Sequence, residues 1–185
     1  MRKDAEQNSV QILTAAEAMH QQGKLIDANM RDIASAAGVG VGTLYRHFAG
    51  KGDLYMALVY AHLNVFLDES DRIIDGNQVH SDVDLPHFLK RCMGFREDNE
   101  ALLLSAEGGL HQGRSFYRSE EFSRLHSLIS RLMQQRLPQS TEDELGFKAD
   151  MLIAMLKSDI YDYERTVRQR TQDELVQQLI DLVIR

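Results

Sequence analysis

The residues of this chain whose types and spacing could do chemistry are concentrated in residues 30–51. The segment reads MRDIASAAGVGVGTLYRHFAGK and ends in an aromatic and basic cluster. Two short helices joined by a tight glycine turn form a helix-turn-helix, whose second helix enters the DNA major groove while the first crosses the backbone. Gly38 stands where the chain must reverse, and a positive φ costs glycine little. The pattern predicts recognition of double-stranded DNA.

The apolar positions of this segment predict which face of each helix is buried. Ile33, Ala34 and Ala37 give the first helix a narrow apolar face, and Leu44 and Phe48 form the buried stripe of the second helix. The remaining face of the second helix is then free for DNA; it carries Val41, Gly42, Thr43, Tyr45, Arg46 and His47.

The elements that must position this segment are also helices. Apolar residues recur at helical spacing, alternating strand patterns are absent, and only two prolines occur. Thr141 with Glu144 and Thr171 with Glu174 have the spacing of capping boxes. We expect an all-α fold of about nine helices. Seven of them are expected at about residues 9–22, 41–48, 51–74, 85–96, 99–110, 119–137 and 141–167. The second helix is expected to start at residue 29, and the last to run from residue 171 to the C-terminus.

Charge divides the chain into two parts of different character. The net charge is −7, but residues 1–52 hold six Lys or Arg and five Asp or Glu, so the remainder carries a net charge of −8. We expect a DNA-binding domain at 1–52, joined through the fourth helix to an effector-binding and dimerisation domain at 53–185. A nearly neutral head gains little from counterion release, so two copies are expected on DNA.

Targeting and catalytic signals are not found in the sequence. The first nine residues are charged, and the apolar runs 56–61 and 151–156 are too short to span a bilayer. A single cysteine, Cys92, excludes an internal disulfide framework and fits a reducing cytoplasm. No Gly-x-Ser-x-Gly nucleophile elbow occurs. We therefore expect a cytoplasmic protein that is not an enzyme, with no cofactor and no membrane partner.

The last two expected helices carry apolar residues on more than one face. Leu152, Leu156, Ile160, Tyr163 and Val167 form one stripe, whereas Met151 and Met155 lie on another face. In the final helix Leu175, Leu179 and Leu182 form one stripe, and Val176, Ile180 and Val183 form a second. One small monomer has little core to cover such helices, which favours a homodimer through a four-helix bundle. Deep burial within the monomer is the alternative.

A small-molecule site is expected in the second domain. Methionine and phenylalanine mixed at helical spacing suit an adaptable pocket for an apolar or aromatic effector, although the same residues also build ordinary cores. The candidates are Phe66, Phe88, Cys92, Met93, Phe95, Leu103, Leu104, Phe116, Tyr117, Phe122, Met151 and Met155.

A metal-responsive site is the competing interpretation of the second domain. His80, His87, His111 and His126, with Cys92, could supply ligands. No pair among them has the close spacing of a zinc motif, so no metal ligand is assigned.

Residues 12–55 resemble the tetracycline-repressor (TetR) family of bacterial transcriptional regulators. The similarity is carried by Ile12-Leu13, Ala15-Ala16, Gly23, Asp32-Ile33-Ala34, Ala37-Gly38-Val39, Gly42-Thr43-Leu44-Tyr45, His47-Phe48, Lys51 and Leu54. The family implies a homodimer with two DNA-binding heads, and most members are repressors released from their operators by a small effector.

The resemblance also implies roles for individual residues. Arg31 would reach a phosphate at the start of the first helix of the motif, and Lys51 would anchor another. Val41, Gly42 and Thr43 would face base edges, Tyr45 and His47 would touch the sugar-phosphate backbone, and Arg46 is free to read a guanine or hold a phosphate. Position 40 is glycine where the family usually has serine or threonine, which removes a capping hydroxyl.

The sequence thus predicts a ligand-responsive repressor that binds a palindromic operator as a homodimer. A helical dimerising module that does not bind DNA, and a metal-responsive regulator without an organic effector, remain the alternatives.

Overall fold

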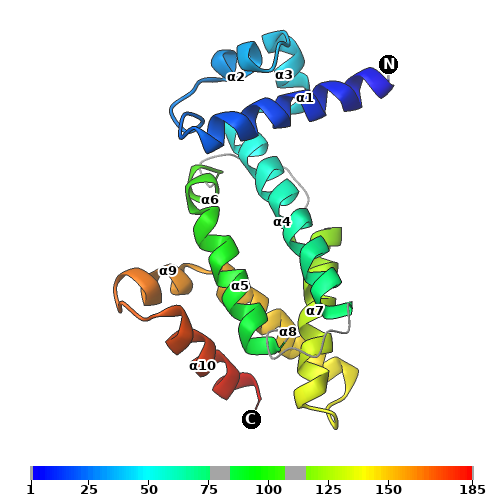
Figure 1. The fold of residues 1–185 in the computed structure, drawn as a ribbon, viewed down its shortest axis with the longest axis vertical. Coiled ribbons are helices and arrows are strands. Elements are labelled where there is room, and N and C mark those ends of the chain that lie inside the picture. The colour runs from blue at the N-terminus through cyan, green and yellow to red at the C-terminus, as the bar shows by residue number, and fades with distance from the viewer. Residues whose placement is uncertain (1, 76–83, 107–115, 185) are drawn as a thin grey trace. The chain divides into compact units, whose positions relative to one another are not determined.

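The computed structural model describes residues 2–75, 84–106 and 116–184, and these ranges consist of helices joined by turns and loops, with no strand (Figure 1). This confirms the all-α fold. The helices are α1 (Arg2–Gln21), α2 (Met30–Ala36), α3 (Val41–His47), α4 (Lys51–Asp75), α5 (Leu85–Asp98), α6 (Glu100–Ala106), the 3-10 helix η2 (Phe116–Arg118), α7 (Glu120–Arg136), α8 (Glu142–Lys157), α9 (Asp159–Thr166) and α10 (Gln172–Val183). No helix in the described ranges is long and apolar enough to cross a membrane.

The helices group into two compact units. The first contains the described residues of 1–63 and 99–113, and the second those of 64–98 and 114–185, so the boundary passes through α4. The functional division at 52/53 stays a prediction, because compactness does not test which residues bind DNA or an effector. Most of the segment between the expected helices at 51–74 and 85–96, and the end of the expected helix at 99–110, lie outside the described residues.

The first unit is built around a small apolar core. Ile12 of α1, Ile33 of α2, Leu44 of α3 and Leu54 of α4 are completely buried, so all four helices contribute to one core. Tyr55 is also buried, and its hydroxyl donates to the carbonyl of Leu25 at 3.1 Å. The expected apolar faces of the two motif helices are therefore confirmed as the inward faces.

A polar group in the first unit joins α1, α4 and the start of α6. The Nε2 atom of His62 lies 2.7 Å from a carboxylate oxygen of Glu17, and its Nδ1 atom lies 2.6 Å from the side-chain oxygen of buried Asn99. Burial opposes ionisation of Glu17, but hydrogen bonds from His62 and Gln21 outweigh it and lower the pKa of Glu17. The histidine thus bridges segments far apart in the sequence.

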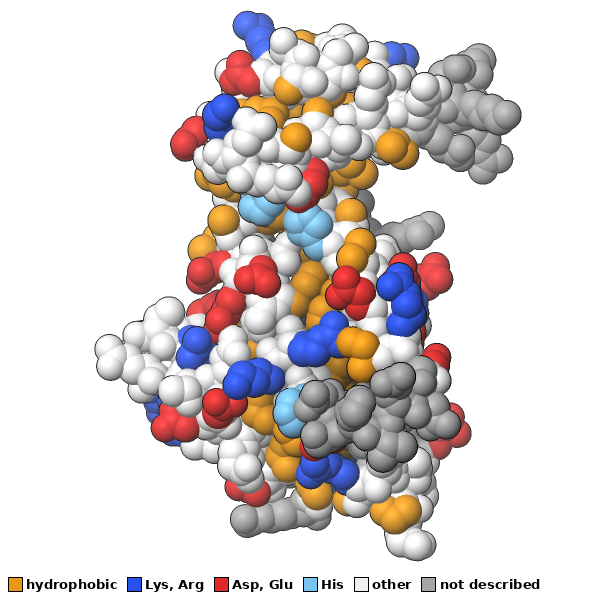
Figure 2. All heavy atoms as spheres, in the orientation of Figure 1, with side chains coloured by type: hydrophobic (Ala, Val, Ile, Leu, Met, Phe, Trp, Pro, Cys, Tyr) orange, Lys and Arg blue, Asp and Glu red, His pale blue; other side chains and the backbone are white. Residues whose placement is uncertain are grey.

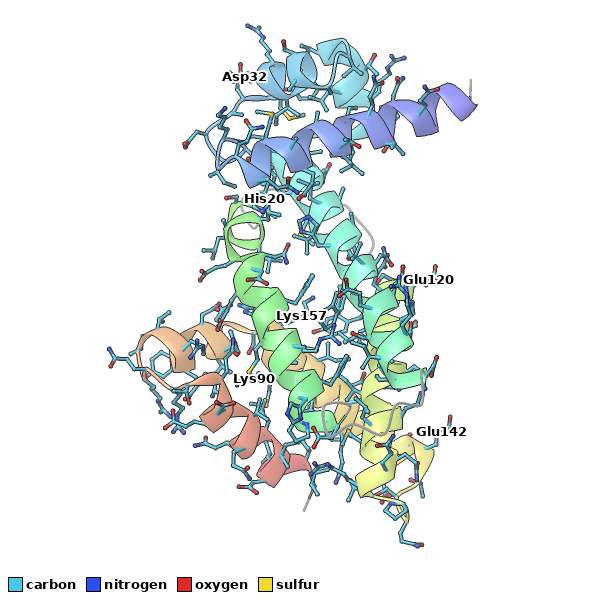
Figure 3. The ribbon with its side chains drawn as sticks, viewed as in Figure 1. His20, Asp32, Lys90, Glu120, Glu142 and Lys157 are labelled. Atoms are coloured by element: carbon cyan, nitrogen blue, oxygen red, sulfur yellow. The ribbon has the colours of Figure 1, made fainter. Side chains whose placement is uncertain are left out.

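Helix starts follow the capping residues expected from the sequence. The Thr141–Glu144 and Thr171–Glu174 pairs form reciprocal capping boxes, and Asn29 with Asp32 (labelled in Figure 3) forms a third at α2. Each box satisfies backbone N–H groups that lack a partner in the first turn. The first helix is longer than expected, starting at Arg2 rather than near residue 9.

The prediction of a single helix over 141–167 is wrong, because the helix is interrupted at Ser158. Its backbone is extended (φ −85°, ψ 161°), and its hydroxyl donates to the carbonyl of Met155 at 2.9 Å, ending α8 and starting α9. Serine followed by Asp159 is a helix-start signal inside an apolar pattern. The stripe expected to run from Leu152 to Val167 is therefore not continuous, and the described α-helices number ten instead of nine.

The second unit packs α5 against α7, α8 and α10, and α7 against α8. Leu89, Met93, Ile129, Met133 and Leu152 are almost fully buried in it. Ion pairs add to this packing at the surface, where Arg124 of α7 contacts Asp68 and Asp71 of α4 at 2.7 and 2.8 Å. These contacts fix the helices that carry the candidate effector residues.

Gly38→Ala is expected to destabilise the first unit by about 1–2 kcal/mol. Gly38 has φ +66°, and a side chain in that conformation is strained even though a Cβ would meet no other atom. Gly40→Ser is the matched control, because φ is −68° there and a hydroxyl would cap α3, which now lacks a side-chain cap. Urea unfolding followed by circular dichroism should show a lower unfolding free energy for Gly38→Ala. For Gly40→Ser the unfolding free energy should rise by about a few tenths of a kcal/mol. Equal stabilities for the two variants would contradict this account of the turn.

Glu97→Gln is expected to destabilise the protein at neutral pH but not at low pH. Burial opposes ionisation of Glu97, but donors from Arg165 (2.7 Å), Tyr161 (2.7 Å) and Gln172 (2.8 Å) outweigh it and hold its pKa below the ordinary 4.5. A lowered carboxyl pKa stabilises the folded state above pH 4.5, and that contribution is lost as pH falls through the folded pKa. The difference in unfolding free energy between wild type and Glu97→Gln, about 0.5–1 kcal/mol at pH 7, should shrink toward pH 3. If the difference in unfolding free energy did not change with pH, ionised Glu97 would not be the source of this stabilisation.

Candidate nucleic-acid interface and effector site

The α2–turn–α3 segment has the geometry of a helix-turn-helix. Gly38 adopts the positive φ expected from the sequence, and the N–H of Val39 donates to the carbonyl of Ala34 at 3.0 Å. Leu44 is fully buried and Phe48 is 7% exposed, so both face the core. Consequently the opposite side of α3 faces away from the core.

The outward side of α3 presents the residues expected to meet DNA. Tyr45 is 52% exposed, and Arg46 is exposed with its guanidinium donating to the hydroxyl of Thr43 at 2.9 Å. Gly42 is exposed, and a Cβ there would meet nothing within 4 Å. Backbone and side chains of α3 can thus approach a groove closely.

Two further expected contacts are only half-exposed. Val41 lies at the first turn of α3, and His47 lies at its last, with its ring 6.3 Å from that of Phe48. Neither side chain is buried, so both remain available to a ligand at the edges of the outward face.

Arg31 and Lys51 flank this face in different ways. Arg31 is exposed in the first turn of α2, as a phosphate contact would require. The ammonium of Lys51 donates to the carbonyl of Ile26 at 2.7 Å and lies 5.5 Å from the ring of Tyr55. Lys51 therefore ties the loop before α2 to the start of α4, a structural contact that its spacing did not indicate.

The expected effector residues fall into separate groups. Phe66 lies with its ring 5.9 Å from Phe88 and 5.3 Å from Phe95, joining α4 to α5. Cys92 and Met93 are buried on α5, and burial raises the pKa of the Cys92 thiol to about 12, as expected for a core residue. This group therefore includes both core residues and half-exposed rings.

The other expected effector residues do not join that group as one set. Phe116 and Tyr117 are neighbours on η2, with ring centroids 5.7 Å apart. Met155 is half-buried on α8, whereas Met151 is 43% exposed. Leu103 belongs to the first unit, on α6, and is not grouped with the others by the structure.

Two basic residues beside the aromatic rings were missed in the sequence. Lys157 ends α8 with its ammonium 4.0 Å from the ring centroid of Phe116, and Arg96 of α5 lies 5.2 Å from the ring of Tyr161. The helical spacing places Arg96 and Lys157 at helix ends, where a basic residue is ordinary. Only the folded chain shows that both cations lie against aromatic rings.

The histidines of the metal alternative are occupied by other contacts where they are described. His87 bonds to Asp84 at 2.7 Å, and the Nε2 atom of His126 lies 3.1 Å from the carbonyl oxygen of Gly146. Within the described ranges, no group of three His, Cys, Asp or Glu side chains could hold a metal ion. His80 and His111 lie outside those ranges.

Comparisons with known proteins agree with the helix-turn-helix. Residues 12–58 match the family model of bacterial regulatory proteins of the tetR family. The chain is 31% identical over 167 residues to an HTH-type transcriptional regulator of Staphylococcus aureus (strain bovine RF122 / ET3-1), covering 89% of this chain and 85% of that protein. A regulator of the same description from strain USA300 is 31% identical over 165 residues, with the same coverage.

Solved structures share the fold. A protein of Pseudomonas aeruginosa PAO1 described as a transcriptional regulator superposes with a TM-score of 0.62 at 17% identity, covering 97% of this chain and 91% of that one. A protein of Clostridium perfringens described as a fatty acid metabolism regulator gives a TM-score of 0.53 at 18% identity, covering 94% and 96%. Together with the exposed face of α3, the sequence relatives show that this chain belongs to the tetR family of bacterial regulatory proteins and is a DNA-binding transcriptional regulator.

Proposed function

We propose that this regulator is a cytoplasmic repressor that binds a palindromic operator as a homodimer and is released by a small-molecule effector. The observation that carries the DNA-binding mode is the outward face of α3, where Thr43, Tyr45 and Arg46 stand on a helix anchored by buried Leu44. In a dimer, two such helices enter successive major grooves about 34 Å apart.

The case for two copies rests on charge and on exposed apolar residues. The head has a net charge of only +1 over residues 1–52, so one copy neutralises few phosphates. Phe147 (64% exposed) and Met151 (43%) lie one turn apart on α8, and Leu182 on α10 is 67% exposed. These three side chains are candidates for a four-helix interface with a second copy.

The interface is narrower than the apolar stripes of the sequence suggest. Leu175, Val176, Leu179, Ile180 and Val183 are 6–8% exposed, so five of the six apolar positions of α10 are covered by the same chain. Burial in the monomer explains most of the α10 pattern, so the dimer proposal rests on exposed apolar residues, among them Phe147, Met151 and Leu182.

Oligomeric state tests this interface. Analytical ultracentrifugation of a Phe147→Asp/Leu182→Asp variant should give a monomer where wild type gives a dimer, because charges in an apolar interface oppose association. Val65→Asp is the matched control, since Val65 is 59% exposed on α4 and should leave the dimer intact. A monomeric wild type would refute the dimer.

Selection of duplexes from a random pool by the purified wild-type protein tests DNA recognition. Sequencing the enriched DNA should yield a palindrome with half-sites about one helical turn apart. No enrichment over the starting pool at low salt would favour the alternative of a helical module that has lost DNA binding.

The effector acts, in this proposal, by stabilising the conformation that does not bind the operator. The usual coupling between two such sites is about 1–3 kcal/mol, or a 5- to 150-fold change in operator affinity. An effector that binds both conformations equally would leave operator affinity unchanged.

A further inference from the structure

Lys157, labelled in Figure 3, lies beside two aromatic rings. Its ammonium is 4.0 Å from the ring centroid of Phe116 and 5.0 Å from that of Tyr117. The chain has 28 acidic and 21 basic residues, yet no Asp or Glu in the described ranges pairs with Lys157. In an acidic protein, a cation that pairs with none of the described carboxylates calls for an explanation.

The surroundings of the Lys157 ammonium disfavour its charge. Desolvation by neighbouring protein atoms, and then the charge of Arg96, lower the pKa of Lys157. The side chain nevertheless stays exposed to solvent. An anion beside the Lys157 ammonium would relieve its repulsion with Arg96.

Arg96 is less free than Lys157 to bind an anion, because three of its N–H donors are already used within the protein. Its guanidinium forms two hydrogen bonds to Asp162, at 2.5 and 3.3 Å, and donates to the carbonyl of Leu156 at 3.2 Å. Arg96 is therefore a fixed positive group. Lys157 has N–H donors that an aromatic ring attracts electrostatically but does not satisfy as an oxygen would.

The rings beside Lys157 offer an apolar surface. Phe116, Tyr117 and Phe122 lie edge to face, with centroids 5.3–5.7 Å apart. None of the three is fully buried, unlike the aliphatic core of the same unit. On the face shown in Figure 2, Lys and Arg side chains over the second unit lie next to hydrophobic ones, so charge and apolar surface occur together.

From this juxtaposition we infer that Lys157 binds the acidic group of an organic anion whose apolar or aromatic body packs against Phe116, Tyr117 and Phe122. The inference rests on the proposed effector-responsive function and names the class of effector as an organic acid. A neutral apolar molecule would cover the same rings but would bring no negative charge to the ammonium.

Matched acids and alcohols test the inference on the full-length protein. Isothermal titration calorimetry would compare benzoate, 2-naphthoate and 4-phenylbutyrate with their corresponding primary alcohols. At least one acid should bind at least tenfold more tightly than its alcohol. Lys157→Met should remove that preference, and Lys157→Arg should keep most of it. Equal binding of every acid and its alcohol, or an unchanged preference in Lys157→Met, would overturn the inference.

The controls separate this site from net charge, folding and the proposed function. Lys90→Met removes a lysine that pairs with Asp173 at 2.6 Å and should leave acid binding unchanged. If Lys157→Met does not fold, Lys157→Gln, which keeps a long polar side chain, decides by the same criterion. Wild type that selects an operator but binds none of the acids would sink this inference alone, whereas acid binding without operator selection would sink only the DNA-binding proposal.

Discussion

Leu44→Ala is expected to cost about 2–5 kcal/mol of unfolding free energy and to unfold the DNA-binding head. Leu44 is fully buried and stands with Ile12, Ile33 and Leu54 in a core shared by four helices. Because α3 has only seven residues, it depends on this contact and not on its intrinsic helix propensity. Urea unfolding and hydrogen exchange of the head amides would measure the loss.

Leu44→Met is the control for this core substitution. It conserves volume and apolar character and should cost less than about 1.5 kcal/mol. Thr43→Ala, at the neighbouring half-exposed position, should change stability by less than about 0.5 kcal/mol. If Leu44→Ala remained within 0.5 kcal/mol of wild type, α3 would not be held by the packing described above.

Arg46→Ala is expected to weaken operator binding by about 30-fold at 0.1 M salt. One charge-assisted contact contributes about 1 kcal/mol or more, and a dimer loses it in both heads, which makes about 2 kcal/mol. If Arg46 holds a phosphate, the slope of log affinity against log salt should also fall by about two. Fluorescence anisotropy across a salt series gives both quantities.

Two variants distinguish this contact from a general effect of charge. Lys24→Ala removes an exposed cation from the loop before α2 and should change affinity by no more than a few fold. Tyr45→Phe removes only a hydroxyl, so affinity should fall while the salt slope stays constant. Equal losses for Lys24→Ala and Arg46→Ala would show that α3 is not the recognition surface.

The features of the head that follow from sequence alone depend on interactions within a few residues. A glycine at position 38 indicates a positive φ there, and Asn29 with Asp32 specifies the cap of α2. The spacing of Leu44 and Phe48 specifies the buried side of α3. These signals act over one or two helical turns, so they can be read before the fold is known.

The second unit shows where such local signals end. At Ser158 the backbone is extended and the hydroxyl donates to the carbonyl of Met155, but the apolar pattern that runs through this position conceals the helix break. In α10 the apolar spacing predicted two separate apolar faces, but the folded chain buries five of its six apolar residues and leaves only Leu182 exposed. Helical periodicity shows that a face is apolar, but the neighbouring helices determine what covers it.

The sequence by itself predicted the all-helical fold and the outward face of α3, because caps, turns and apolar spacing are local, whereas the tetR family followed from the resemblance of residues 12–55. Tertiary structure alone decided the electrostatics of the second unit. Arg96 and Asp162 are 66 positions apart and form their ion pair only after folding, and folding also brings the Lys157 ammonium against the ring of Phe116, with no carboxylate of the described residues paired to it. Charge pairing depends on distance in space, and a linear sequence does not record that distance.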